Sequence, residues 1–418
     1  MTDCETAFAN WLQQDIGIKK TQAITISHHL RDRFVLSLCE EKNEKASQYT
    51  ALETIIPTLS SDLEKASAWV QYTTWLKEQP DKPLFFNEEH ITLRKVYVPL
   101  RAYYEDTINT SNIIKVVVNL EKELTNWVNN FNKDDAIRMI SGGPGAGKSS
   151  VTKMFADKKA DKIHVLFIEL CDLPKIWENS LKEGIKEYLE TTTPLNKMLL
   201  DAKNGERRLL LIFDGLDELA ISGKLVTEVA QQFVKEIAII VKGGNKQETI
   251  KWQALISGRD IVIQAAAKKN IHVLHLLPYY IPENKRIREY PGFDELLEPD
   301  QRNEWWIKYG YPNGLPTQFK PPKDKNKKAE KLDEITSQPL LNYLIALQLA
   351  LKGEDDHTTS VSSEEINLNT IYAGLIQAVY TRDWADEKHN TLGELEEEDF
   401  YYLLQEISIA IWHNNDKN

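Results

Sequence analysis

Residues 142–149 read Gly142-Gly143-Pro144-Gly145-Ala146-Gly147-Lys148-Ser149 and fit the pattern G-x-x-x-x-G-K-[ST] at every fixed position. An apolar, strand-like run at 137–140 precedes them, and a helix-compatible run at 149–156 follows. A glycine-rich turn between a strand and a helix directs backbone N–H groups and the positive end of the helix toward phosphate. The stretch therefore predicts a phosphate-binding loop, here named the phosphate loop, in an α/β domain.

Each position of the phosphate loop has an expected role. The glycines let the backbone approach the phosphates without interference from side chains. Lys148 is expected to bridge the β- and γ-phosphates, and the Ser149 hydroxyl is expected to bind Mg²⁺. The nucleotide-binding residues predicted from the loop are Gly142, Gly143, Pro144, Gly145, Ala146, Gly147, Lys148, Ser149 and Ser150.

Outward from the loop, apolar runs alternate with helical segments. The runs that read as strands lie at 136–141, 163–170, 209–213, 254–257 and 271–277. Alternating strands and helices indicate βαβ units, and continuously apolar strands indicate a sheet covered on both faces. We expect an α/β fold: a parallel sheet of the P-loop NTPase type with helices on both faces, flanked by an N-terminal helical region and a C-terminal helical subdomain.

A second motif is acidic. The apolar run 209–213 ends in Asp214-Gly215-Leu216-Asp217-Glu218, which places carboxylates at the sheet edge where open α/β sheets bind ligands. Asp214 is the expected Mg²⁺ partner, usually through water. Asp217 and Glu218 are candidates to orient or deprotonate an attacking water.

A third strand-like run, 252–258, ends in Arg259. A cation at that edge is a candidate to sense the γ-phosphate or to stabilise charge in the transition state. The stretch Asn245-Lys246-Gln247-Glu248 partly matches the guanine-reading N-K-x-D pattern, but it precedes a strand and ends in Glu. ATP or dATP is therefore favoured over GTP.

The flanking regions read mainly as helices. Helical spacing predicts helices at 4–12, 26–38 and 63–76 before the loop, and at 303–307, 340–351, 366–380 and 403–412 after it. Residues 92–100 read as an extended segment, and 117–128 read as a helix.

Composition limits the classes of function. The net charge of −12 argues against attraction to nucleic acid through the overall field. No apolar run reaches the roughly 18 residues that span a bilayer, and the N-terminus has no signal-peptide pattern. The three cysteines, Cys4, Cys39 and Cys171, are too few and too scattered for a disulfide framework or a zinc site. We expect a cytoplasmic protein that binds neither membrane nor nucleic acid.

The motifs together resemble the NACHT family of signal-transducing NTPases, within the STAND class. An apolar strand followed by D-G-x-D-E is the family's acidic motif, and the arginine-ended strand before Arg259 is similar to a second family feature. Ser337-Gln338-Pro339-Leu340 is similar to the Pro-Leu pair that opens a helix in the family's helical subdomain. Residues 367–384 resemble the segment that enters the winged-helix region.

The resemblance implies a slow ATPase that acts as a switch. Nucleotide is expected to bind together with Mg²⁺ between the α/β core and the helical subdomain, with Pro339 near the base. Exchange or hydrolysis would rearrange the domains and lead to homo-oligomerisation, triggered by a protein or pathogen-derived partner in antiphage defence or innate immunity. The expected domains are a helical N-terminal region at 1–90, the NTPase core at 91–280, the helical subdomain at 281–365 and the start of a winged-helix-like region, apparently incomplete, at 366–418.

Two alternatives stay open from the sequence. One is an AAA+-like remodelling ATPase with steady turnover and an arginine supplied by a neighbouring subunit, although the D-G-L-D-E wording argues against it. The other is a helical adaptor in which nucleotide only stabilises the fold.

Overall fold

The computed structural model describes residues 3–20, 23, 27, 57–83, 91–108, 112–194, 208–219, 225–246, 250–267, 271–316, 335–351, 373, 376 and 397–415. The chain divides into two compact units. The first unit comprises Met1–Pro80, Glu121–Gly142 and Lys148–His275, and the second comprises Asp81–Leu120, Gly143–Gly147 and Leu276–Asn418.

Within these ranges the strands form a seven-stranded sheet in the order β2-β1-β7-β3-β6-β5-β4. Its strands are β1 (Arg101–Ile108), β2 (Asn112–Asn119), β3 (Ile137–Ser141), β4 (His164–Glu169), β5 (Arg208–Asp214), β6 (Lys251–Gly258) and β7 (His272–Leu276). β3 pairs in parallel with β6 and β7, β5 pairs in parallel with β4 and β6, and β1 and β2 form an antiparallel pair. The expected α/β fold with a mostly parallel sheet is confirmed.

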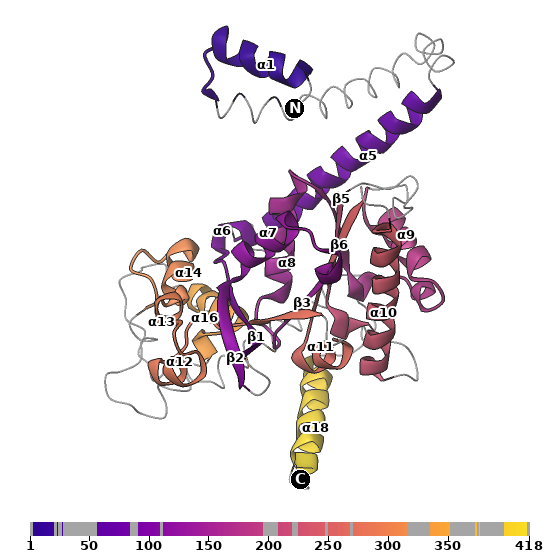
Figure 1. Cartoon of the computed structure of the whole chain (residues 1–418). Coiled ribbons are helices and arrows are strands. Elements are labelled where there is room, and N and C mark those ends of the chain that lie inside the picture. Colours follow the sequence, from indigo (N-terminus) through magenta and orange to yellow (C-terminus); the bar gives the residue numbers. More distant parts are fainter. Residues whose placement is uncertain are drawn as a thin grey trace. The chain divides into compact units, whose positions relative to one another are not determined.

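The sheet of the first unit is covered on both faces. α8 (Lys148–Ala160) lies on one side of the strands, and α9 (Leu181–Thr192) and α10 (Val226–Gly244) lie on the other (Figure 1). The chain moves one way along the sheet from β3 to β4 and the opposite way from β4 through β5 to β6. Right-handed crossovers therefore place the connecting helices on opposite faces.

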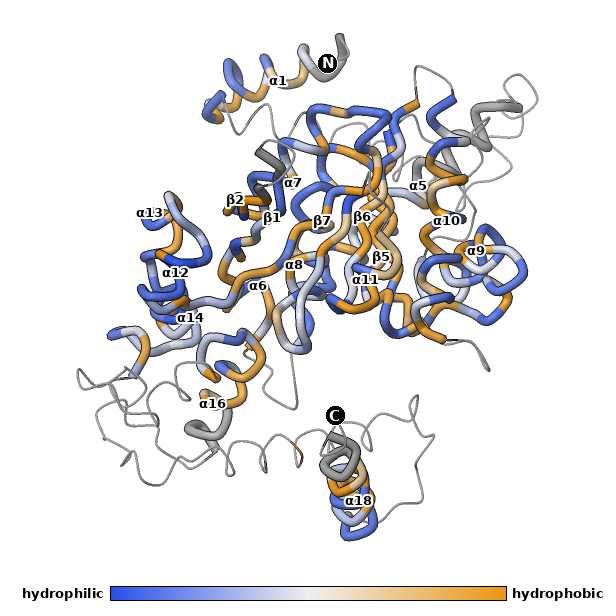
Figure 2. The backbone as a smooth tube through the Cα atoms, turned by 60° about the horizontal axis from the view of Figure 1, so that its bottom comes forward, coloured by the Kyte–Doolittle hydropathy of each residue, from blue (hydrophilic) through white to orange (hydrophobic). Residues whose placement is uncertain are grey.

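Burial follows from this layering. The β5 residues after Arg208 are all buried, and β5 and β6 are mainly hydrophobic in Figure 2. A strand covered on both faces must be apolar at every position, in contrast to the alternation of a half-exposed strand. Because β3, β5 and β6 run parallel, their carboxyl ends meet at one edge of the sheet. The phosphate loop, the acidic motif and Arg259 follow these strand ends.

In the first unit, α1 (Asp3–Gln14) and α5 (Pro57–Glu78) are the described N-terminal helices. The short η1 (Gln79–Asp81), whose last residue belongs to the second unit, follows α5. The fully buried Tyr72 of α5 contacts β4, which ends the sheet. Its hydroxyl accepts from Phe167 N (2.9 Å) and lies 3.4 Å from Phe167 O, to which it donates. Trp69 stacks on His164 with ring centroids 4.2 Å apart. α5 thus covers an edge whose backbone groups would otherwise be open for pairing.

The remaining elements of the first unit connect and extend the sheet. They are α7 (Leu120–Asn129), whose first residue belongs to the second unit, α11 (Asp260–Ala266), and the short 3-10 segments η2 (Lys133–Asp135), η3 (Leu170–Asp172), η4 (Lys175–Glu178) and η5 (Leu216–Glu218).

The second unit combines the β1–β2 pair with helices. Its helices are α6 (Leu93–Val96), α12 (Glu283–Glu289), α13 (Asp294–Leu297), α14 (Gln301–Tyr309), α16 (Pro339–Leu351) and α18 (Glu397–Asn415). A buried cluster of Val117, Leu277, Ile281, Tyr290 and Leu297 packs β2 against the segment that carries α12 and α13.

Two local expectations were wrong. Residues 92–100 are not extended throughout, because the Thr92 side chain caps Lys95 N (3.4 Å) and starts the helical turn Leu93–Val96. The helix expected at 117–128 begins at Leu120, and Val117 belongs to β2, whose β-branched residues favour a strand when a partner strand is present.

Most of the other predicted helices are confirmed, and two lie in parts of the chain that the structure hardly describes. The predicted helices at 4–12, 63–76, 303–307, 340–351 and 403–412 all fall inside observed helices. Those at 26–38 and 366–380 lie almost entirely outside the described residues. The four domain ranges stay a prediction.

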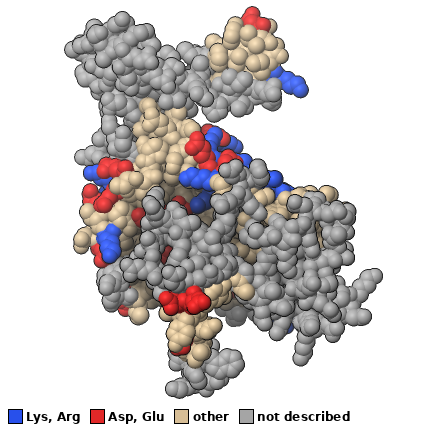
Figure 3. Space-filling model, turned by 180° about the vertical axis from the view of Figure 1, so that it is seen from behind, with Lys and Arg blue, Asp and Glu red and all other residues tan. Residues whose placement is uncertain are grey.

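Among the described residues, no helix is both long enough and apolar enough to cross a membrane. On the face shown in Figure 3, basic and acidic side chains of the described residues lie side by side in the upper half, and a smaller patch near the lower end is acidic alone.

Candidate functional site

The phosphate loop leaves β3 at Gly142 and enters α8 at Lys148, with Ser149 and Ser150 in the first helical turn. Gly142 N donates to Gly258 O (3.3 Å), which ties the start of the loop to the end of β6. Lys148 Nζ donates to Gly142 O (2.8 Å), so the ammonium group lies beside the start of the loop. Burial lowers the pKa of Lys148, and the nearby carboxylates of Asp217 and Asp214 oppose this shift.

The apex of the loop needs glycine for conformation and space. Gly145 (φ 73°) and Gly147 (φ 90°) are left-handed, where other residues are strained. A Cβ added at Gly143 would meet nothing within 4 Å. The side of Gly143 on which a Cβ would lie therefore faces open space. Ala146 N donates to Gly143 O (3.3 Å), which closes a turn that contains Pro144 and Gly145.

Asp214 ends β5 and is held by two hydroxyl groups. Its Oδ1 accepts from Thr152 Oγ1 (3.0 Å) and from Ser257 Oγ (2.5 Å). Thr152 is fully buried and lies three residues after Ser149, on the same face of α8. The Ser257 hydroxyl also accepts from Gly215 N (3.1 Å). These contacts fix the Asp214 carboxylate, which is only 6% exposed, in one orientation.

Asp217 and Arg259 form a pair. Arg259 Nε lies 2.6 Å from Asp217 Oδ2, and Arg259 N donates to Asp217 Oδ1 (3.0 Å). The Asp217 side chain is 9% exposed, whereas that of Arg259 is 59% exposed. Both carboxylate oxygens of Asp217 are thus used to hold Arg259 at the end of β6, with its guanidinium toward solvent.

Glu218 has a different environment from Asp217. Its N–H donates to Gly215 O (2.8 Å), and its carboxyl packs so closely on Gly215 (φ 85°) that a Cβ there would lie 2.9 Å from the carboxyl carbon. Partial desolvation raises the pKa of Glu218, and a hydrogen bond with Cys171 opposes this shift. Desolvation of the thiol, with Asp172 and Glu218 beside it, raises the pKa of Cys171 to about 12, so the thiol is a neutral donor at neutral pH.

Pro339 is the first residue of α16 and lies against the loop apex within the second unit. Its Cγ would lie 3.5 Å from a Cβ at Gly147. The next residue, Leu340, donates its N–H to Gly145 O (3.2 Å). The position of Pro339 relative to a base stays a prediction.

The motifs did not reveal three residues that contact this site: Thr152, Ser257 and Cys171. Two had a signal in the sequence. Thr152 shares a helix face with Ser149, and Ser257 stands near the carboxyl end of the predicted strand at 254–257, where ligand-binding side chains collect. Cys171 had none, because only folding brings η3 beside η5.

The residues fit a Mg²⁺–triphosphate. Mg²⁺ prefers oxygen ligands, and in nucleotide sites it takes one or two from the protein and others from phosphates and water. Ser149 and the fixed carboxylate of Asp214 offer this donor set. The ammonium of Lys148, in the same unit, suits a polyphosphate.

Comparisons with known proteins add a family match. The model described as NACHT N-terminal Helical domain 3 matches residues 1–93 of the 418. This agrees with the resemblance carried by the motifs of the core. No curated protein matches the sequence.

Two solved structures illustrate the structural matches. Domain III of the Thermotoga maritima replication initiation protein DnaA is 15% identical, with a TM-score of 0.31, and the alignment covers 62% of this chain and 90% of that one. C. elegans PCH-2 is 15% identical, with a TM-score of 0.27, and the alignment covers 63% of this chain and 70% of that one.

Proposed function

We propose that this chain binds ATP or dATP with Mg²⁺ through residues 142–149, hydrolyses it slowly, and acts as a nucleotide-dependent signalling switch of the NACHT type. The observation that carries the proposal is the fixed carboxylate of Asp214, bonded to Thr152 on the helix that begins with Lys148 and Ser149. A phosphate loop followed by a helix whose first turn faces an immobilised carboxylate is the arrangement that a Mg²⁺–triphosphate requires.

Each residue has a role in this proposal. Backbone N–H groups of the loop and the Lys148 ammonium bind the β- and γ-phosphates, and Ser149 and Asp214 hold Mg²⁺. When bound, the metal neutralises charge that develops on the phosphates. We assign to Arg259, which Asp217 holds at the end of β6, the role of stabilising charge on the γ-phosphate.

Glu218 is a better candidate for the general base than Asp217. Asp217 already uses both oxygens on Arg259, whereas the raised pKa of Glu218 makes its carboxylate a stronger proton acceptor. In the proposed step, water oxygen bonds to the γ-phosphorus and the bond to the β–γ bridging oxygen breaks. The proton of the water passes to Glu218, and the bridging electrons stay on the departing diphosphate.

The signalling part rests on the motifs of the core and on the match of residues 1–93 to a NACHT-associated helical domain. We propose that nucleotide state changes the placement of the helical parts, that activated chains associate with copies of themselves, and that a protein or pathogen-derived trigger starts the change. A role in antiphage defence or innate immunity completes the proposal.

The biochemical test uses the full chain, a fluorescent ATP analogue and a phosphate-release assay. We expect Mg²⁺-dependent binding by wild type, loss of binding in Lys148→Ala, and retained binding without hydrolysis in Glu218→Gln. A wild-type chain that binds no purine triphosphate overturns the proposal. Binding without hydrolysis favours a structural nucleotide, and rapid sustained turnover favours a remodelling ATPase.

The defence role has its own test. Bacteria that carry the wild-type gene should survive phage infection better than bacteria that carry Lys148→Ala at equal protein abundance. Equal survival of the two strains refutes the defence role and leaves the ATPase proposal standing.

A further inference from the structure

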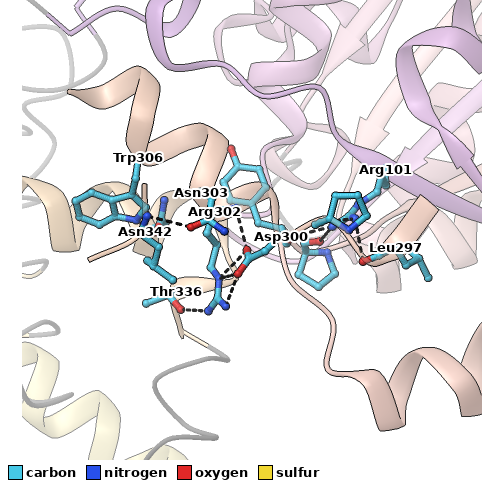
Figure 4. Close-up of polar contacts among 12 residues, drawn as sticks. Arg101, Leu297, Asp300, Arg302, Asn303, Trp306, Thr336 and Asn342 are labelled. Atoms are coloured by element: carbon cyan, nitrogen blue, oxygen red, sulfur yellow. Dashed lines mark hydrogen bonds and ion pairs between the residues drawn. The ribbon is translucent and has the colours of Figure 1, made fainter. Parts of the chain in front are cut away.

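A chain of buried polar contacts in the second unit starts at Arg302 in α14. The Arg302 side chain is 1% exposed and bonds both oxygens of Asp300, with Nε at 2.9 and 3.1 Å and Nη2 at 2.7 Å. Its Nη1 donates to Thr336 Oγ1 (2.7 Å), and the guanidinium lies 4.2 Å from the centre of the Tyr280 ring. Figure 4 shows Arg302 between Asp300 and Thr336. A planar guanidinium held on one side leaves Thr336 little freedom.

Two more contacts fix the chain on either side of the start of α16. Tyr279 N donates to Ser337 O (2.8 Å), and Trp306 Nε1 donates to the fully buried Asn342 at Oδ1 (2.8 Å). Tyr279 is itself held, because the buried Arg101 donates to its carbonyl (2.7 Å). Arg101 also donates to the carbonyls of Pro278, Leu296, Leu297 and Pro299. Residues 336–342, here named the clamp, are thus anchored at both ends.

The middle of the clamp contacts the phosphate loop, whose apex Gly143–Gly147 belongs to the same unit. Leu340 N donates to Gly145 O (3.2 Å), and the Leu340 Cβ lies 3.0 Å from the position of a Cβ on Gly145. A trans peptide directs its C=O and N–H in opposite directions. A carbonyl of Gly145 held by Leu340 therefore sets the direction of the Ala146 N–H, which donates to Gly143 O (3.3 Å) and closes the turn of the loop. The shape of that turn decides where the other loop N–H groups point, and therefore whether the loop can bind phosphate.

We propose that Arg302 is a positioning residue for nucleotide binding: it acts through Thr336 and Leu340 to hold Gly145 in its phosphate-binding conformation. This inference rests on the proposed function. A buried ion pair such as Arg302–Asp300 adds little to stability compared with apolar packing. The ion pair instead fixes the position of the Arg302 guanidinium, which in turn holds Thr336, the first residue of the clamp. By linkage, a nucleotide that needs this loop conformation stabilises the clamp as much as the clamp favours the nucleotide.

The first test compares two substitutions of Thr336 in the full chain. Thr336→Val keeps the shape but removes the hydroxyl that accepts from Arg302, whereas Thr336→Ser keeps the hydroxyl. We expect the Mg²⁺-dependent Kd of a fluorescent ATP analogue to rise about tenfold in Thr336→Val and to stay within about twofold of wild type in Thr336→Ser. A folded Thr336→Val chain with wild-type affinity overturns the inference, whatever happens to its melting temperature.

Hydrogen exchange supplies a readout that a purely structural role would not change. ATP with Mg²⁺ should slow amide exchange in residues 338–342 of wild type, and this slowing should be smaller in Thr336→Val at saturating nucleotide. Equal slowing in both chains counts against the clamp. If Thr336→Val does not fold, Trp306→Phe, which removes the Nε1–H donor to Asn342 at the other end, decides by the same Kd criterion.

The failure of this inference is distinct from failure of the proposed function. A wild-type chain that binds no nucleotide refutes the function itself. A wild-type chain that binds, loses binding in Lys148→Ala and is unchanged in the clamp variants refutes only the positioning role of Arg302.

Discussion

The Thr152 hydroxyl of α8 lies 3.0 Å from Oδ1 of Asp214, its acceptor on β5, and 3.1 Å from the carbonyls of Lys148 and Ser149. The bond to Asp214 holds the carboxylate that we assign to Mg²⁺. We predict that Thr152→Val weakens nucleotide binding about tenfold in the presence of Mg²⁺, since hydrogen bonds to charged groups contribute about 1.5–3 kcal/mol. In EDTA, Thr152→Val and wild type should bind equally.

The matched control is Thr191→Val, which removes the hydroxyl of an exposed threonine that donates to Glu187 O within α9 (2.7 Å). Its affinity should equal that of wild type in both conditions. An equal loss by Thr152→Val with and without Mg²⁺ would show that Thr152 does not act through the metal.

Alanine substitutions at Gly143 and Gly145 distinguish a methyl group that collides with the protein from one that collides with a bound ligand. A Cβ at Gly145 meets Leu340 at 3.0 Å and φ is 73°, whereas a Cβ at Gly143 meets nothing within 4 Å. We predict that Gly145→Ala lowers the melting temperature of the nucleotide-free protein and that Gly143→Ala does not.

Nucleotide titrations of the same two variants complete this test. If phosphate occupies the open space at Gly143, Gly143→Ala should bind nucleotide more weakly while its stability is unchanged. Wild-type affinity in Gly143→Ala would place the phosphates elsewhere.

Glu218 provides a prediction about pH and stability. Partial desolvation, with the carboxylates of Asp214 and Asp217 nearby, raises its pKa in the folded protein above the unfolded value, so the folded state binds the proton more tightly. The stability that this proton contributes is fully present below the unfolded pKa and is lost as pH rises through the folded pKa. Glu218→Gln, which resembles the protonated form, should therefore melt at a higher temperature than wild type at pH 8 and at a similar temperature at pH 4.

Substitutions of Cys171 test whether the Glu218 carboxylate acts as the base during ATP hydrolysis. Its hydrogen bond lowers the pKa of Glu218, so Cys171→Ala should move the acid limb of the kcat profile to higher pH, and Cys171→Ser should restore it. If Glu218 is not the base, the acid limb will stay in place in Cys171→Ala.

The sequence predicted some features and missed others for physical reasons. β5 could be predicted because a strand buried on both faces is apolar at every position, and the phosphate loop because its residues are contiguous. The β1–β2 pair could not, because Val117 and its neighbours fit helical spacing as well as a strand. Thr152 and Ser257 reach Asp214 from different elements, so neither contact is visible in any one motif.

The hydrogen bonds between the Tyr72 hydroxyl and the backbone of Phe167 stabilise the packing of α5 on β4, and the size of this effect can be tested. The hydroxyl bonds both backbone groups of Phe167 and is fully buried. Tyr72→Phe should lower the free energy of unfolding of the first unit by about 1–3 kcal/mol, because two buried backbone groups lose their partner. Tyr402→Phe, on a 64% exposed tyrosine of α18 in the second unit, should change the free energy of unfolding of either unit by less than about 0.5 kcal/mol.

Urea denaturation followed by tryptophan fluorescence measures both variants, and amide exchange at Phe167 reports the edge directly. Faster exchange at Phe167 in Tyr72→Phe, with unchanged exchange in the centre of β5, would place the loss at the β4 edge. Because β4 leads through Glu169 to the segment that carries Cys171, loosening this edge should also lower the rate of ATP hydrolysis while leaving nucleotide affinity unchanged. Unchanged exchange at Phe167 would mean that α5 is held on β4 by its apolar side chains alone.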